Sequence, residues 1–217
     1  MTERTRGTVS LLMSAAPWEI DPPLKLPRLE LLARLAVDTR NRALAEADRD
    51  AGDTNWGIGC KAHERFVHAV SRLAARGEHG WLRVHREGLS FTSIIDGISV
   101  RAYCGSADAP QQRHIQAAYH DRDRGDRRQL ALPFASTGAV DDGWVWLMAV
   151  EIDDAGRAVR VVFFQANEYG ETRSSYRISF EEEQAKLALD VPQERARSAS
   201  RTATRRAVST AERRQAR

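Results

Sequence analysis

Residues 81–103, WLRVHREGLSFTSIIDGISVRAY, decide the fold, because here the apolar residues change from a helical spacing to an alternating one. The residues that alternate with polar neighbours are Leu82, Val84, Ile98, Val100 and Ala102. Two turn sequences, Glu87-Gly88 and Asp96-Gly97, divide the stretch, and Asp-Gly between alternating segments is a strong hairpin signal. The stretch therefore predicts three antiparallel strands in succession.

Two helices are predicted on the N-terminal side of these strands. Residues 28–48 contain no Gly or Pro and carry a stripe of apolar residues at helical spacing, and Pro27 suits the first turn. Residues 50–59 are rich in Gly, Asp and Asn, and this composition predicts a loop. A second helix with an apolar stripe follows the loop and is expected to end at Gly77.

More strands are predicted on the C-terminal side, at residues 130–134, 144–152, 158–166 and 172–180. Within them, 144–150 and 159–164 are apolar on both faces, as in central strands that are covered on each side. A short helix is predicted at 110–120, and the charged run 120–128 is expected to neutralise itself in solvent. The fold class that follows is α+β, with two N-terminal helices packed on an antiparallel meander sheet of about six to seven strands.

The chain has 217 residues, of which 42% are hydrophobic and 29% charged. This composition can form a core, which excludes a fully disordered chain, a collagen-like repeat and a coiled-coil rod. We predict three parts: a flexible N-terminal arm (1–27), a single α+β domain (28–191) and a basic C-terminal tail (192–217). The formal net charge of +3 is unevenly divided, because residues 192–217 alone carry +6 and the rest of the chain −3.

The tail contains eight arginines and two glutamates and too little apolar surface to form a core. It is therefore predicted to be disordered or a lone helix that orders on contact. In a helix, Arg197, Arg201 and Arg205 would form one basic ridge, and Arg206 and Arg213 add charge. Guanidinium groups bind phosphate oxygens in pairs and release counterions. The first hypothesis is thus a non-enzymatic binding or regulatory module whose tail contacts nucleic acid or an acidic partner.

Other interpretations of the same chain stay open. The 30 arginines against 3 lysines indicate a general arginine bias, so the tail is also explained as a solvated segment without a partner. A metal-dependent nuclease or ribonuclease toxin could use Glu64, Asp96 and Glu151 as its carboxylates. A structural subunit that docks through its tail is a third class. No cofactor and no resident metal are predicted.

A weak anion-binding signal lies before the second predicted helix. Gly57, Gly59 and Lys61 combine free backbone amides at a helix start with a positive charge. The spacing departs from a phosphate-binding P-loop, which has four residues between its glycines and Ser or Thr after the lysine. An ordinary glycine turn is the alternative.

Several classes are excluded or disfavoured by what the chain lacks. No window of 18 or more apolar residues is present, so no membrane-spanning helix is predicted. The two cysteines, Cys60 and Cys104, lie 44 residues apart and form no CxxC pair, which disfavours a disulfide scaffold and a structural zinc site. The expected location is the reducing cytoplasm.

Overall fold

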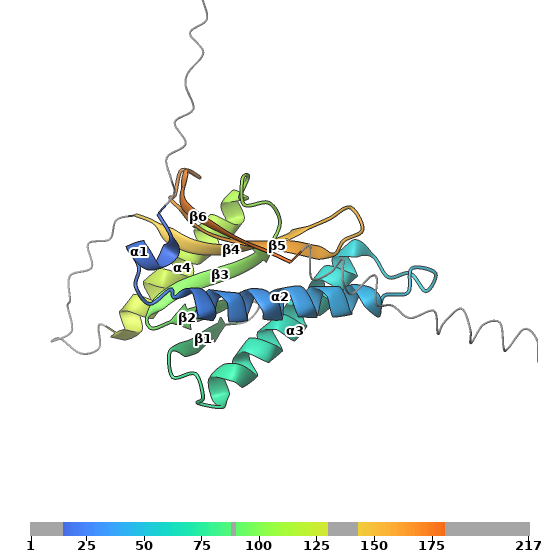
Figure 1. Cartoon of the computed structure of the whole chain (residues 1–217), viewed down its shortest axis with the longest axis horizontal. Coiled ribbons are helices and arrows are strands. Elements are labelled where there is room, and N and C mark those ends of the chain that lie inside the picture. The colour runs from blue at the N-terminus through green and yellow to red at the C-terminus, as the bar shows by residue number, and fades with distance from the viewer. Residues whose placement is uncertain (1–14, 88–89, 130–142, 181–217) are drawn as a thin grey trace, which may run out of the picture. The chain divides into compact units, whose positions relative to one another are not determined.

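The computed structural model describes residues 15–87, 90–129 and 143–180. The chain divides into two compact units, Met1–Ser179 and Phe180–Arg217, and every described helix and strand belongs to the first. The helices are α1 (Pro17–Ile20), α2 (Leu26–Ala45), α3 (Asn55–Ala75) and α4 (Gln112–Gln129). The strands are β1 (Leu82–Glu87), β2 (Ser90–Ile95), β3 (Ile98–Cys104), β4 (Val145–Ile152), β5 (Ala158–Ala166) and β6 (Thr172–Ser179), shown in Figure 1. The predicted α+β class is confirmed.

Within the described residues the strands form one six-stranded sheet in the order β1-β2-β3-β4-β5-β6. Neighbouring strands are antiparallel except for β3 and β4, which run parallel with Val100 opposite Trp146. A parallel pair needs a long crossover connection, and α4 lies in that connection. The predicted purely antiparallel meander is therefore wrong at this pair. The strand predicted at 130–134 lies outside the described residues.

The Asp96-Gly97 hairpin is confirmed. Ile95 of β2 lies opposite Ile98 of β3, so the two residues between them make the turn. Their φ angles are 45° and 96°, both positive, as a tight type I′ hairpin turn requires. Asp and Gly tolerate this conformation, which explains why the sequence signal at this position was reliable.

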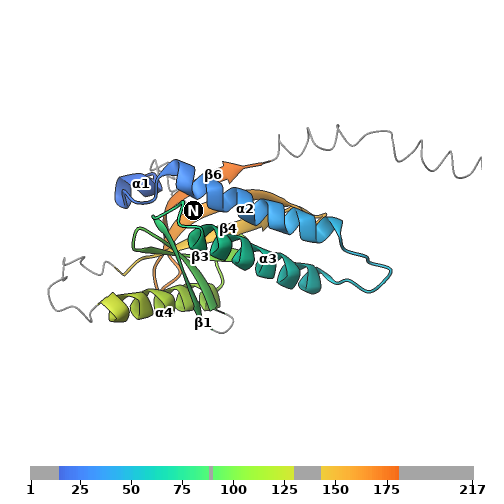
Figure 2. The ribbon, with the colours of Figure 1, turned by 90° about the horizontal axis from the view of Figure 1, so that it is seen from below.

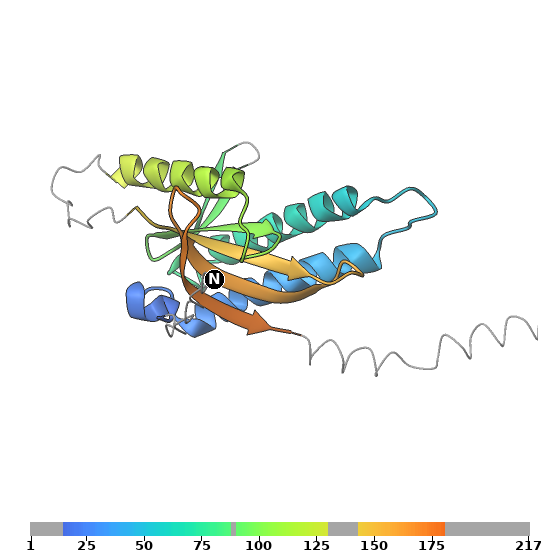
Figure 3. The ribbon, with the colours of Figure 1, turned by 90° about the horizontal axis from the view of Figure 1, so that it is seen from above.

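Helices cover both faces of the sheet: α2 and α3 lie on one face and α4 on the other (Figures 2 and 3). Consecutive residues of a strand point to opposite faces, and Phe163 and Phe164 of β5 are 0% and 1% exposed. Phe164 belongs to a core cluster with Leu147 of β4 and Ile115 of α4. The prediction that β4 and β5 are covered on each side is confirmed.

The second helix begins earlier than predicted. Thr54 is the N-cap of α3, and its side chain accepts a hydrogen bond from the Gly57 amide at 3.1 Å. A threonine cap satisfies one of the amides that a helix start leaves free, and this contact extends the helix back over both glycines. The predicted loop is therefore wrong for residues 55–59, and Gly57 and Gly59 lie inside the first turns of α3.

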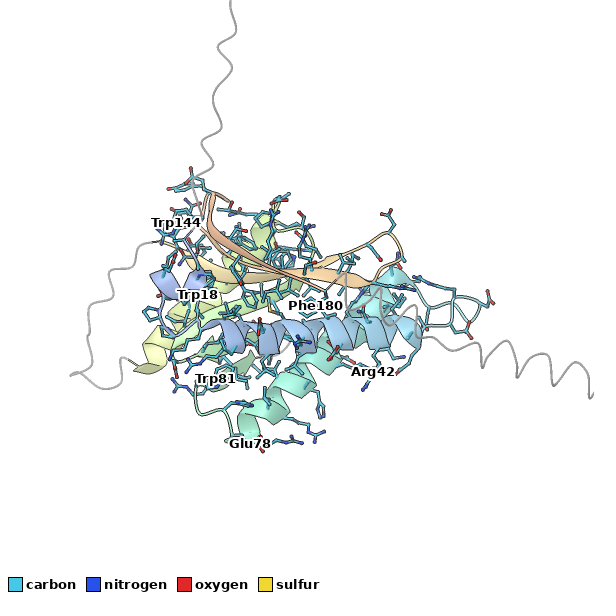
Figure 4. All side chains as sticks on the ribbon, in the orientation of Figure 1. Trp18, Arg42, Glu78, Trp81, Trp144 and Phe180 are labelled. Atoms are coloured by element: carbon cyan, nitrogen blue, oxygen red, sulfur yellow. The ribbon has the colours of Figure 1, made fainter. Side chains whose placement is uncertain are left out.

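Part of the predicted flexible arm packs against the sheet. Trp18 of α1 makes an edge contact with Tyr176 of β6, with 4.9 Å between the ring centroids. Asp21 accepts a hydrogen bond from the indole nitrogen of buried Trp146 at 2.7 Å. Figure 4 labels Trp18 near the N-terminal end of α2. Residues 15–27 of the predicted arm thus include α1 and make contacts with the sheet, and residues 1–14 lie outside the described part of the chain.

Helix α4 continues through the charged run that was expected to stay in solvent. The predicted helix ended at His120, whereas α4 ends at Gln129. Asp121, the first acid of the run, is 4% exposed and contacts the sheet. None of the helices in the described ranges combines the length and apolarity that crossing a bilayer would require.

Candidate functional site

The three carboxylates of the nuclease hypothesis lie in three separate places. Asp96, in the β2–β3 turn, makes an ion pair with Arg28 of α2 at 2.5 Å. Glu151, near the end of β4, makes an ion pair with Arg160 of β5 at 2.5 Å. Glu64 is exposed on α3.

The strand register shows how far apart Asp96 and Glu151 are. Asp96 lies four residues before Val100, and Glu151 lies five residues after Trp146, which is the partner of Val100 in the parallel pair. Asp96 and Gly97 make the turn, so about seven residues of strand, roughly 23 Å, separate the two positions, and the carboxylates lie near opposite ends of the sheet. Two carboxylates that act on one metal-bound phosphate must be within a few ångströms of each other. The fold therefore does not join Asp96 and Glu151 into one catalytic site.

Glu151 instead holds the β3–α4 connection in place. Its carboxylate accepts hydrogen bonds from the Ala107 amide at 3.0 Å and from Arg160 Nε at 2.6 Å. Burial by itself would raise the pKa of Glu151, but these hydrogen bonds and the charge of Arg160 lower it below the usual value. The group is thus a charged structural acceptor at neutral pH.

All three residues of the predicted anion site lie in α3. The Gly57 amide is taken by the Thr54 side chain, and Gly59 lies within the helix. Lys61 points to Glu46 at the end of α2, with 3.6 Å between Nζ and Oε2, and Arg65 contacts the same carboxylate. Lys61 therefore helps to hold α3 against α2. Anion binding at Gly57, Gly59 and Lys61 stays a prediction.

A buried polar cluster joins α4 to the sheet. The Asp121 carboxylate accepts a hydrogen bond from Ser90 Oγ at 2.9 Å and further hydrogen bonds from Thr92 and Arg101. Arg101 also donates to Ser90 Oγ at 3.0 Å. Since the Asp121 side chain is only 2% exposed, its charge depends on these donors. The cluster has the composition of a structural anchor, and no local sequence pattern indicates it.

His114 of α4 stacks on Tyr103 of β3, with 4.5 Å between ring centroids and 17° between ring planes. Burial and the nearby charges of Arg113 and Arg101 lower the pKa of His114 below 6.5. The unfolded chain therefore binds this proton more readily than the folded one, and stability is lost as the pH falls below 6.5.

We expect the free energy of unfolding to fall between pH 7.5 and 5.5, and the His114→Gln variant to show a shallower fall. One proton contributes at most about 1.4 kcal/mol per pH unit. His63, whose pKa is also lowered by burial, keeps part of the slope in the variant. Urea unfolding at several pH values measures the slope of the free energy of unfolding against pH. An unchanged slope in the variant contradicts the assignment to His114.

The buried charge of Arg40 was not predicted from the sequence. Arg40 of α2 is 5% exposed and lies on the helix face that also buries Ala36, Val37 and Ala43. Its Nε donates a hydrogen bond to the Gly156 carbonyl in the β4–β5 turn at 2.9 Å. The signal that could have revealed it is an arginine four residues after Ala36 and three before Ala43, at the spacing of the apolar stripe.

The predicted nucleic-acid contacts Arg197, Arg201, Arg205, Arg206 and Arg213 lie outside the described residues. Within the described ranges, no three His, Cys, Asp or Glu side chains are grouped so that they could hold a metal ion. Comparisons with protein-family models, curated proteins and solved structures find no match to this chain.

Proposed function

We propose that this protein is a non-enzymatic nucleic-acid-binding module that contacts phosphates through its arginine-rich segment 192–217. The observation that carries the proposal is the charge division of the chain: +6 in these 26 residues and −3 in all the others. Nucleic acid is proposed as the partner because Arg197, Arg201 and Arg205 are spaced four residues apart and would form one ridge in a helix, which suits a row of backbone phosphates. The planar guanidinium matches phosphate oxygens in a bidentate fashion, and it keeps its charge at any physiological pH.

The ion pairs of the described body support this division of roles. The acids Asp96, Asp121 and Glu151 are each paired with an arginine of the body itself. Arginines used in this way are not available to phosphates. The excess of arginine over acid in the segment 192–217 is the largest local surplus of positive charge in the chain.

The test compares two full-length variants with the same net charge. One replaces Arg197, Arg201, Arg205, Arg206 and Arg213 with Gln, and the other replaces five exposed arginines of the body, Arg72, Arg76, Arg83, Arg86 and Arg157. Each variant changes the formal net charge from +3 to −2. We expect the tail variant to lose at least about tenfold in affinity for a labelled oligonucleotide, and the body variant to lose little.

Fluorescence anisotropy at several salt concentrations provides the measurement. Three or four phosphate contacts give a slope of log K against log salt of about −3 to −4, which the tail variant should bring close to zero. Equal losses in both variants would mean that net charge alone is responsible and would refute the assigned segment. If the unaltered protein does not bind DNA or RNA but binds a polyglutamate peptide, the acidic-partner hypothesis replaces this proposal. Binding to neither leaves the docking-subunit hypothesis and overturns the proposal.

A further inference from the structure

Arg40 is a buried cation whose hydrogen-bonding capacity is largely unused. Only its Nε has a partner, the Gly156 carbonyl at 2.9 Å. Among the described residues, neither terminal nitrogen of the guanidinium donates a hydrogen bond and no carboxylate makes an ion pair with it. Arg28 and Arg101, whose side chains are 19% and 18% exposed, are by contrast each paired with an acid.

A buried guanidinium without a counter-charge is unfavourable, because it loses most of its hydration and gains no opposite charge in return. Neither terminal nitrogen of Arg40 is among the fully buried polar atoms that lack a hydrogen bond in the described residues, so both can still be reached from solvent. Arg28 and Arg101 resolve this problem with Asp96 and Asp121. Arg40 has no such solution within the part of the chain that the structure describes. An anion from outside the protein would supply the opposite charge that Arg40 lacks.

Two glycines lie next to the terminal nitrogens of Arg40, one beside each nitrogen. A Cβ on Gly59 would meet Arg40 Nη1 at 3.8 Å and, apart from atoms of its own helix and chain neighbours, nothing else within 4 Å. A Cβ on Gly156 would lie 3.3 Å from Nη2, which is too close for an easy fit. Gly156 also has a φ of +83°, a conformation that other residues rarely adopt. The space beside Nη1 at Gly59 is therefore open to a small group, whereas at Gly156 the missing side chain makes room for Nη2 itself.

We propose that Arg40 binds the oxyanion group of a small molecule, with its two terminal nitrogens donating to two oxygens beside Gly59. A bidentate pair is the geometry that guanidinium forms with phosphate and carboxylate groups. Because Arg40 is 95% buried, the bound group is small and the site does not admit a nucleic-acid strand. The site lies towards the C-terminal end of α2, where Figure 4 labels Arg42. It is independent of the segment 192–217, so either proposal can fail without the other.

Cys104, at the end of β3, provides a reporter for the site. Cys104 is exposed as a residue, but its thiol is partly buried, and this burial raises the thiol pKa. The positive charge of Arg40 acts in the opposite direction and lowers the pKa. An anion bound to Arg40 would cancel that effect and reduce the fraction of thiolate, which is the reactive form. Cys60 is the other free cysteine, exposed on α3.

The experiment measures the rate of alkylation of Cys104 by iodoacetamide in the full-length Cys60→Ser protein. Inorganic phosphate and acetate are the two probes, each compared with chloride at equal ionic strength. We expect phosphate, acetate or both to slow the reaction about threefold or more, and Arg40→Gln to remove the effect. A phosphate-only effect identifies a phosphate group, and an effect of acetate extends the site to carboxylates. No effect of either probe, or an equal effect in Arg40→Gln, overturns the proposal.

A second pair of variants keeps the test valid if Arg40→Gln does not fold. Gly59→Ala places a methyl group next to Nη1, whereas Gly57→Ala places one 3.6 Å from Thr54 Oγ1 and not against Arg40. Both changes raise helix propensity, so they are matched in their effect on α3. We expect Gly59→Ala to need several-fold more of the anion for the same protection and Gly57→Ala to behave like the parent. The same protection in both variants would place the anion elsewhere.

Discussion

Asp121→Ala is expected to lower the free energy of unfolding by about 3–5 kcal/mol, because it breaks a buried ion pair by removing one partner. Asp121 accepts hydrogen bonds from Ser90, Thr92 and Arg101, and its side chain is 2% exposed. Without the carboxylate, the Arg101 charge stays under α4 with its main acceptor gone. Arg101 Nε is already buried without a hydrogen bond in the described part of the chain, so little remains to compensate.

Urea unfolding of Asp121→Ala, followed by circular dichroism, measures this loss. Asp154→Ala is the matched control, since Asp154 is exposed in the β4–β5 turn and its removal should change stability by less than about 0.5 kcal/mol. Stabilities of small domains are about 5–15 kcal/mol, so the Asp121 variant will be close to unfolding at moderate temperature. Equal stabilities of the two variants would mean that the charged run lies in solvent, as its sequence alone suggested.

Phe163→Ala and Phe164→Ala are each expected to cost about 3–5 kcal/mol, the range for emptying a buried aromatic site. The two side chains are 0% and 1% exposed although they are consecutive in β5 and therefore point to opposite faces. Phe164 also makes an edge contact with Tyr103, with 6.4 Å between ring centroids. A sheet with one face in water would lose much at only one of the two positions.

The comparison of the two phenylalanine variants thus tests whether helices cover both faces of the sheet. Thermal and urea unfolding should give similar losses for both, and Tyr169→Ala, which removes an 80% exposed ring, should change stability by less than about 0.5 kcal/mol. A large loss at one phenylalanine and a small loss at the other contradicts the two-layered core.

Local patterns were sufficient where a structure depends on residues that are close in the sequence. The Asp96-Gly97 turn follows from the backbone freedom of these two residues, and the buried strands β4 and β5 follow from their uninterrupted apolar runs. The start of α3 shows the limit of this approach. The Gly-rich composition of residues 50–59 predicted a loop, but the Thr54 cap and the packing of Ile58 in the core extend the helix across both glycines.

The candidate sites depended on partners that are distant in the sequence. Glu151 and Asp96 were chosen as catalytic acids by residue type, but Arg160 and Arg28 neutralise them at separate places. Arg40 carries no motif, and its significance lies in the missing acid around it and in the contact with Gly156, 116 residues away. No spacing rule connects such residues.

The sequence by itself determined the α+β class, the hairpins, the buried central strands and the separation of a +6 segment from a −3 remainder, because each depends on local spacing, backbone preference or composition. Only the tertiary structure decided the parallel pairing of β3 with β4, the burial of Asp121 and the isolation of Arg40. Asp121 is 20 residues from Arg101, and the crossover of α4 brings the two together. The energy of a buried charge depends on what surrounds it in space, and the same Asp-Arg run would be stable in solvent without that contact.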